Sequence, residues 1–168
     1  LIQNTSFTYD NNRNKTSINR LNTPNKSEQY NYDNGDRLIN YKRGVIGGTL
    51  TTNNTYTYDA LGNRTNANQN GNNTVYTSNN LNQLINSNNG VQNINYTYDT
   101  NGNLSDDGKY YKTYDAEGRL IKDSASVLNV LTYKYDAFGR RVQKTLNGLV
   151  ANYTFSELQQ IEERESNG

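Results

Sequence analysis

Aromatic and polar side chains alternate over short stretches that recur along the whole chain. In Tyr56-Thr57-Tyr58, two rings occupy positions i and i+2 and a threonine lies between them. Alternation with period two places both rings on one face of a β-strand and the threonine on the other. Aromatic and β-branched residues also favour strands. The pattern therefore predicts short strands with one tyrosine-lined face.

The alternating stretch is an internal repeat that ends in Asp. The second aromatic position falls at residues 9, 32, 58, 78, 98, 114 and 135, with spacings of 23, 26, 20, 20, 16 and 21 residues. A period near twenty suits two short strands and two turns, with insertions placed in the turns. The copies are Phe7-Thr8-Tyr9-Asp10, Tyr30-Asn31-Tyr32-Asp33, Tyr56-Thr57-Tyr58-Asp59, a worn Tyr76-Thr77-Ser78-Asn79, Tyr96-Thr97-Tyr98-Asp99, Lys112-Thr113-Tyr114-Asp115 and Tyr133-Lys134-Tyr135-Asp136.

The Asp of each copy is predicted to open a turn that closes on a glycine. In Asp136-Ala137-Phe138-Gly139, Asp stands at i and Gly at i+3 of a type I turn, and Gly can take the positive φ of a G1 bulge. The other glycines at this position are Gly62, Gly102 and Gly118. Asp36 and Asn82 replace Gly in two copies, and both residue types tolerate positive φ. Arg13 does not fit, so we expect the first repeat to be frayed or built differently.

A second type of turn separates successive copies. Asn70-Gly71, Asn89-Gly90, Asp107-Gly108 and Asn147-Gly148 are strong hairpin signals. The prediction is an all-β fold, a continuous antiparallel meander of roughly a dozen strands that must coil or curl because sheets twist. Residues 1–150 would hold seven repeats and residues 151–168 a post-repeat segment. In that segment, Ser156-Glu157-Leu158-Gln159 fits the capping box of a short helix, and helix or strand stays open.

Composition removes several classes of function. The 168 residues carry 17 Lys plus Arg and 16 Asp plus Glu, so a net charge of +1 predicts neither nucleic-acid nor anionic-membrane binding. Apolar runs are too short to span a bilayer. Cys and His are absent, which removes thiolate metal sites and the commonest general base, and no cofactor is predicted. A mean hydropathy of -1.05 would fit disorder, but 15 tyrosines recurring in register argue against it.

Three chemical interpretations compete with a purely structural one. The repeated Asp residues could form a carboxylate pair for glycoside hydrolysis, but their constant place at the start of a turn favours a structural role. Asp106 and Asp107, with Asp99 and Asn103, hint at calcium but lack the spacing of an EF-hand. Rows of tyrosine could stack on sugars, although packing between strands is favoured. An enzyme is therefore not predicted.

The Tyr-Asp-x-x-Gly-Arg copies resemble the Rhs or YD-repeat family. The resemblance rests most clearly on residues 114–120 and 135–141, and it covers about residues 7 to 145. The family includes bacterial polymorphic toxins, insecticidal toxin-complex shells, wall-associated proteins and teneurins. It implies a long sheet wound into a hollow shell, which in toxin members encloses a C-terminal toxic domain, and an exported or cell-surface setting in a bacterium. The Asp-Pro-x-Gly element of self-cleaving members is missing, since Pro24 is the only proline.

Two functions follow from the sequence. The first is a non-catalytic segment of an exported toxin shell. The second is an extracellular structural protein that polymerises through open sheet edges into a filament, tube or adhesive module. The partners expected are further repeats of the same or a larger chain, other copies end to end, an enclosed toxin domain or a surface carbohydrate.

Overall fold

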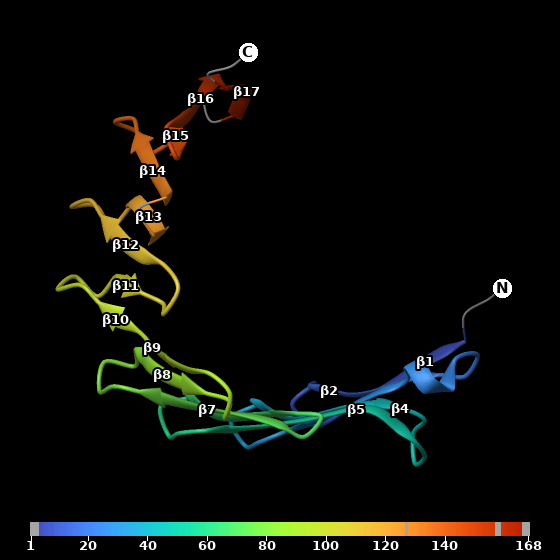
Figure 1. The fold of residues 1–168 in the computed structure, drawn as a ribbon. Coiled ribbons are helices and arrows are strands. Elements are labelled where there is room, and N and C mark those ends of the chain that lie inside the picture. Colours follow the sequence, from blue (N-terminus) through green and yellow to red (C-terminus); the bar gives the residue numbers. More distant parts are fainter. Residues whose placement is uncertain (1–3, 127, 157–158, 166–168) are drawn as a thin grey trace. The chain divides into compact units, whose positions relative to one another are not determined.

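The computed structural model describes residues 4–126, 128–156 and 159–165. The chain divides into two compact units, Leu1–Asn93 and Ile94–Gly168, and each is described by itself. Both are built from antiparallel strands (Figure 1). None of the described helical segments is long and apolar enough to cross a membrane.

The first sheet has nine strands that follow one another in sequence order, each hydrogen-bonded to the next. A short 3-10 turn, η1 (Pro24–Lys26), interrupts the connection between its second and third strands. The strands are β1 (Thr5–Tyr9), β2 (Lys15–Arg20), β3 (Glu28–Tyr32), β4 (Leu38–Gly44), β5 (Leu50–Tyr58), β6 (Arg64–Gln69), β7 (Asn72–Ser78), β8 (Leu84–Asn88) and β9 (Asn93–Asn95).

The second sheet has eight strands, again in sequence order. They are β10 (Thr97–Tyr98), β11 (Leu104–Asp106), β12 (Tyr111–Tyr114), β13 (Leu120–Ser126), β14 (Asn129–Tyr135), β15 (Arg141–Leu146), β16 (Leu149–Ser156) and β17 (Gln159–Glu165). The all-β antiparallel meander predicted from the repeats is therefore confirmed. The expectation of one continuous sheet of about a dozen strands is wrong. Each copy gives two strands, the chain breaks between sheets at Tyr96, and the tail adds a further hairpin.

Burial follows the period-two pattern that the sequence predicts. In β5, Tyr56 and Tyr58 are half-buried while Thr57 between them is exposed. Few of the described residues are fully buried. The buried residues among those described are Ile18, Ser27, Gly44, Ala67, Ser87 and Tyr153.

The four Asn-Gly or Asp-Gly turns are of two kinds. At Asn70-Gly71 both residues have positive φ, 53° and 92°, and Asn147-Gly148 is similar at 50° and 90°, which defines type I′ hairpins. At Asn89-Gly90 and Asp107-Gly108 only the glycine has positive φ, and the connection is wider. There the side-chain oxygen at position 89 or 107 accepts backbone N–H bonds from two following residues. All four dipeptides thus separate strands, but only two form two-residue hairpins.

The tail continues the second sheet. β16 pairs with β15 and β17 pairs with β16, so the described part of residues 151–168 is strand on both sides of residues 157–158, which lie outside the described residues. Strand formation through Ser156 and again from Gln159 does not support a helix starting there. The division into seven repeats up to residue 150 and a separate tail remains a prediction.

Candidate functional site

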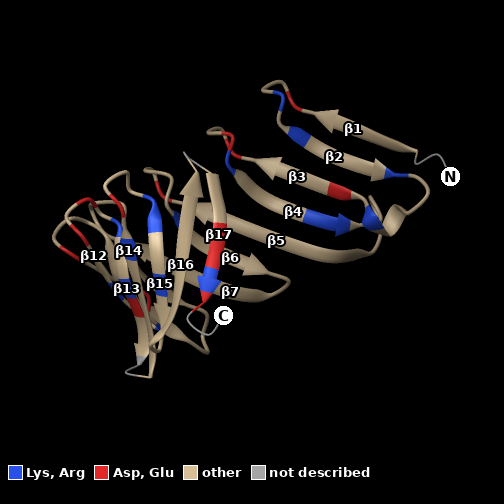
Figure 2. Ribbon diagram, turned by 90° about the horizontal axis from the view of Figure 1, so that it is seen from above, with Lys and Arg blue, Asp and Glu red and all other residues tan. Residues whose placement is uncertain are grey.

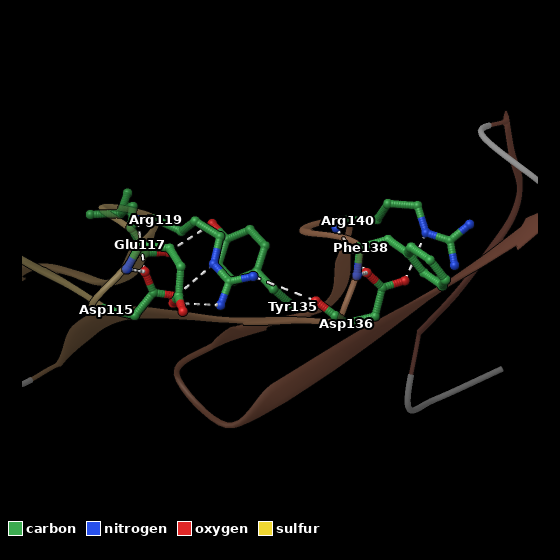
Figure 3. A network of polar contacts seen from close by, with 8 residues as sticks. Asp115, Glu117, Arg119, Tyr135, Asp136, Phe138 and Arg140 are labelled. Atoms are coloured by element: carbon green, nitrogen blue, oxygen red, sulfur yellow. Dashed lines mark hydrogen bonds and ion pairs between the residues drawn. The ribbon is translucent and has the colours of Figure 1, made fainter.

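The Asp at the start of each turn organises a compact hydrogen-bonded loop. The Oδ1 atom of Asp136 accepts the backbone N–H groups of Phe138 at 2.9 Å and Arg140 at 3.0 Å. The Gly139 N–H donates to the Asp136 carbonyl at 3.0 Å, and the strand ladder slips by one residue beside the turn. Gly139 has a φ of 78°. The turn is therefore the type I turn with a G1 bulge that the sequence predicts (Figure 3).

The same loop recurs at every copy, including the first. Arg13 has a φ of 68°, its N–H donates to the Asp10 carbonyl at 3.1 Å, and Asp10 Oδ1 accepts the N–H groups of Asn12 and Asn14. The expectation that the first repeat is frayed or built differently is wrong. The remaining bonds of the turn hold residue 13 in the left-handed region although an arginine has no special preference for it.

A side chain four residues after the Asp completes each turn, and sequence reasoning missed it. It bonds the second oxygen of the Asp; for example, Arg140 Nε donates to Asp136 Oδ2 at 2.7 Å and Asn63 Nδ2 to Asp59 Oδ2 at 2.9 Å. In the worn copy the roles are reversed, because Asn79 Nδ2 donates to Gln83 Oε1 at 2.8 Å. The available signal was a constant Asn, Gln or Arg at this spacing: Asn14, Arg37, Asn63, Gln83, Asn103, Arg119 and Arg140.

The second tyrosine of a repeat ties that repeat to the previous one. Its hydroxyl donates to the backbone carbonyl five residues after the previous copy's Asp. The bonds run from Tyr32 to Lys15 at 2.9 Å, Tyr58 to Leu38 at 2.8 Å, Tyr114 to Leu104 at 2.9 Å and Tyr135 to Leu120 at 2.8 Å. The repeated tyrosine is therefore a junction residue with a used hydroxyl, as well as a packing residue.

Arginine at the fourth position adds a second bond across the junction. The Arg119 guanidinium pairs with Asp115 Oδ2 at 2.6 Å, lies 4.9 Å from the Tyr135 ring centre and donates to the Asp136 carbonyl at 3.4 Å (Figure 3). Arg37 repeats all three contacts in the first sheet, pairing with Asp33, lying 4.9 Å from the Tyr58 ring and donating to the Asp59 carbonyl at 2.9 Å. One guanidinium thus serves two consecutive repeats.

Asparagine at the fourth position makes a different junction. Asn14 Nδ2 donates to Asp36 Oδ1 at 2.6 Å, and Asn63 Nδ2 donates to Asn82 Oδ1 at 3.0 Å. Asp36 and Asn82 are two of the three residues, with Arg13, that replace Gly at the bulge position. Asp36 and Asn82 therefore supply an acceptor for the preceding repeat, in addition to tolerating positive φ.

The pKa values of the turn carboxyls and of the buried tyrosine phenols are shifted in opposite directions. Desolvation raises the pKa of Asp136, but the Arg140 N–H and guanidinium and the Phe138 N–H outweigh it, so the pKa lies below its ordinary value. The amide of Asn63 is the main cause of the lowered pKa of Asp59. Burial raises the pKa of Tyr133. The carboxylates are thus held ionised and the phenols neutral.

The charged groups considered for chemistry are used in the fold. Asp107 caps its loop and forms an ion pair with Lys112, and Asp106 Oδ1 accepts the Gly108 N–H at 2.8 Å. Across the described ranges, no three His, Cys, Asp or Glu side chains gather as a metal site would need. Asp99 belongs to its own turn, with Gly102 closing it at a φ of 85°. Each repeated Asp is hydrogen-bonded within its own turn, which is the structural role that the sequence favours.

A family model described as the teneurin YD-shell matches residues 1–161. The chain belongs to the teneurin YD-shell family. The YD-repeat resemblance seen in the sequence is confirmed, and the fold is that of a structural shell.

The curated relatives and solved structures that match this YD-shell segment are much longer proteins, of which it covers a small part. The tRNA nuclease WapA of Bacillus subtilis and the tRNA3(Ser)-specific nuclease WapA of Bacillus spizizenii are each 41% identical over 106 residues, which is 60% of this chain and 4% of theirs. The structure of TcdB2-TccC3 without its hypervariable C-terminal region matches with a TM-score of 0.66 at 18% identity, over 96% of this chain and 10% of that one. A Photorhabdus luminescens Tc holotoxin pore matches with a TM-score of 0.51 at 16% identity, over 95% and 12%. The structural matches support the fold.

The Asp turns of this YD-shell segment that are completed by Asn and those that are completed by Arg should differ in how well they tolerate an Asp→Asn change. Asp99→Asn should be mild, because the Asn103 amide can turn its oxygen towards the new Nδ2, as Gln83 does for Asn79. Asp115→Asn should lower the urea midpoint clearly more, because its new Nδ2 would face the Arg119 guanidinium, which has no acceptor. Adding Arg119→Gln to Asp115→Asn should recover part of the loss, because it restores the bond within the turn but gives up the contacts of Arg119 with the next repeat. Equal midpoints for the two single variants would contradict this account of the turns.

Proposed function

We propose that this chain is a segment of the wall of a YD-repeat shell that encloses a toxin in an exported bacterial protein. The observation that supports this most is the junction network. The hydroxyls of Tyr58 and Tyr135 each donate a hydrogen bond to a backbone carbonyl of the preceding repeat. Arg37 and Arg119 each pair with the Asp of their own turn and also donate to the Asp carbonyl of the next repeat. In such a sheet each repeat is stabilised mainly by bonds to its neighbours, as expected for one segment of a longer repeat array that forms the wall of a shell.

The proposed role is non-catalytic. The WapA relatives are named as nucleases, but this chain spans only 4% of their length, so the named activity need not involve the matched region. We expect the purified chain to leave tRNA intact under conditions in which a ribonuclease control cuts it. Cleavage of tRNA that disappears in an Asp115→Asn variant would contradict the proposal. Cleavage that is unchanged in this variant would indicate a contaminating nuclease.

The shell itself is tested in the parent protein. The flanking reading frame should encode further YD repeats and an unrelated domain beyond them. In the full-length protein that domain should resist protease as long as the repeats stay folded, and should become sensitive when the repeats are opened by denaturant. A reading frame that holds repeats alone, or a downstream domain cut as fast in the intact protein as in isolation, would rule out enclosure.

A self-assembling extracellular structural protein is the second candidate, and one edge of the structure favours it. β1 pairs only with β2 among the described strands and contains no charged residue (Figure 2). The open sheet edges that this function requires are not found at the last strand, however. β17, an edge strand of the second sheet beyond the aromatic segment 153–155, carries Glu162, Glu163, Arg164 and Glu165. Charged edge strands resist strand addition.

End-to-end filament growth through the first and last strands needs both of them to be open, and of these two only β1 is free of charged residues. We therefore expect light scattering of the isolated chain to show monomers and limited association through β1, without growth into long polymers. Filaments in negative stain would instead favour the structural-polymer function. The variant Phe7→Lys, which places a charge on the half-exposed β1 side chain, should suppress whatever association occurs, while Ile161→Lys on β17 should leave it unchanged.

A further inference from the structure

The fourth residue after the Asp of one repeat is matched to the bulge residue of the next. Asn14 faces Asp36 and Asn63 faces Asn82 through hydrogen bonds. A third asparagine shows the same direction, because a Cβ built on Gly118 would lie 3.6 Å from Asn103 Oδ1. A side chain at the bulge position therefore points towards the fourth residue of the preceding repeat.

Where the fourth residue is arginine, the bulge residue that follows is glycine. Arg37 precedes Gly62 and Arg119 precedes Gly139, and a Cβ built on either glycine meets nothing within 4 Å. The guanidinium there reaches the tyrosine ring and the Asp carbonyl of the next repeat. Arginine junctions thus leave the bulge position without a side chain, and asparagine junctions accept one.

The β1 edge carries the two residues that the later repeat contributes to such a junction, the second tyrosine and the bulge residue. Tyr9 is 58% exposed, and no hydrogen bond joins its hydroxyl to a described residue, in contrast to Tyr32 and Tyr58, which are half-buried and donate to backbone carbonyls. Arg13 occupies the bulge position with a φ of 68°. By the direction shared by Asp36 and Asn82, the Arg13 side chain projects to the side from which a preceding repeat would arrive.

We propose that the edge formed by β1, Tyr9 and Arg13 docks the second strand of another YD repeat, and that it selects a repeat with Asn rather than Arg four residues after its Asp. The Tyr9 hydroxyl would donate to the backbone carbonyl five residues after that Asp, as Tyr32 does to Lys15. The Asn would donate Nδ2 to its own Asp and accept from the Arg13 guanidinium through Oδ1. An Arg there would instead face Arg13 as a like charge.

This inference deepens the proposed function, because it rests on further repeats continuing the sheet. The test appends one additional copy of residues 50–71, which contains Asp59 and Asn63, directly before residue 3 of the full chain, in the register that β7 has after β6. A matched fusion differs only by Asn63→Arg in the appended copy. That substitution keeps the appended turn intact, since Arg37 completes the equivalent turn at Asp33.

Hydrogen exchange of the β1 amides that face away from β2 reports docking. We expect the Asn fusion to slow their exchange on the order of tenfold more than the Arg fusion does. Introducing Arg13→Gly in both fusions should remove this difference, and Tyr9→Phe should speed exchange in both. Equal protection by the two fusions would overturn the selectivity while leaving the shell proposal standing. Fast exchange in both fusions would overturn the docking edge itself, whatever the parent reading frame encodes.

Discussion

The free energy of unfolding should be nearly flat between about pH 6 and pH 9 and should fall on both sides of that range. Histidine, whose ordinary pKa lies inside this window, is absent from the chain. The groups with shifted pKa values that matter for the fold are the turn carboxyls, which titrate below the window, and the tyrosine phenols, which titrate above it.

The acid side reflects the turns. A carboxyl whose folded pKa lies below its unfolded value stabilises the fold above the unfolded value, here 3.8, and this contribution is lost as the pH falls through the folded pKa. The same shift occurs in copy after copy, so the losses act together and the acid effect should be large. The carboxyls with lowered pKa are Asp33, Asp59, Asp99, Asp107, Asp115 and Asp136.

The alkaline side reflects the tyrosine face. Burial is the main cause of the raised pKa of Tyr30, which also donates to Glu28 at 2.6 Å. A phenol whose folded pKa is raised stabilises the fold below its unfolded value of 10.0, and this contribution is lost as the pH rises through the folded pKa. Burial likewise raises the pKa of Tyr32, Tyr41, Tyr114, Tyr133 and Tyr153.

Urea titrations followed by circular dichroism from pH 2 to pH 12 measure both limbs. Tyr30→Phe should reduce the alkaline limb without changing the acid limb. Asp59→Asn should reduce the acid limb alone, because the amide keeps the Oδ1 acceptor and does not titrate. Midpoints that stay constant from pH 7 to pH 2 would show that the turn carboxylates contribute nothing to stability.

Periodic features of the sequence predicted the strands and turns because both depend on the conformational preferences of a few neighbouring residues. The alternation around Tyr58 and the Asp-x-x-Gly spacing at Asp136 both lead directly to the local structure observed. Arg13 was misjudged because intrinsic φ preference is weak against a turn fixed by Asp10 and its neighbours. The β17 edge was missed because strand pairing beyond residue 156 depends on a partner, β16, that no local pattern specifies.

The junction contacts could not be predicted from one repeat, because their partners lie in the next. Asp36 can be explained within its own turn by its tolerance of positive φ, yet its carboxylate is also the acceptor for Asn14 from the preceding copy. The Tyr135 hydroxyl bonds a carbonyl 15 residues earlier, a separation that varies with insertion length between copies. Comparing the fourth residue of one copy with the bulge residue of the next would have exposed the match.

Replacing Gly139 by Val should destabilise the chain by about 1–3 kcal/mol more than replacing Ala137 by Val. Gly139 has a φ of 78°, a region that β-branched residues resist, whereas Ala137 is an exposed residue at the second position of the same turn. A Cβ on Gly139 would meet nothing within 4 Å, so the cost comes from the backbone rather than from a steric clash.

Gly139→Asn separates backbone strain from the simple loss of glycine. Asn82 has a φ of 59° at the equivalent position of its own copy, so the Asn variant should stay close to the parent chain in stability. Urea titrations of the three variants give the comparison, with the slope of the transition checked for constancy. Because the Gly139 bulge also sets the register of Tyr135 against Arg141, Gly139→Val should in addition speed hydrogen exchange in β14 and β15, whereas Ala137→Val should not. Equal midpoints for the two Val variants would show that positive φ at the bulge is not what holds this turn.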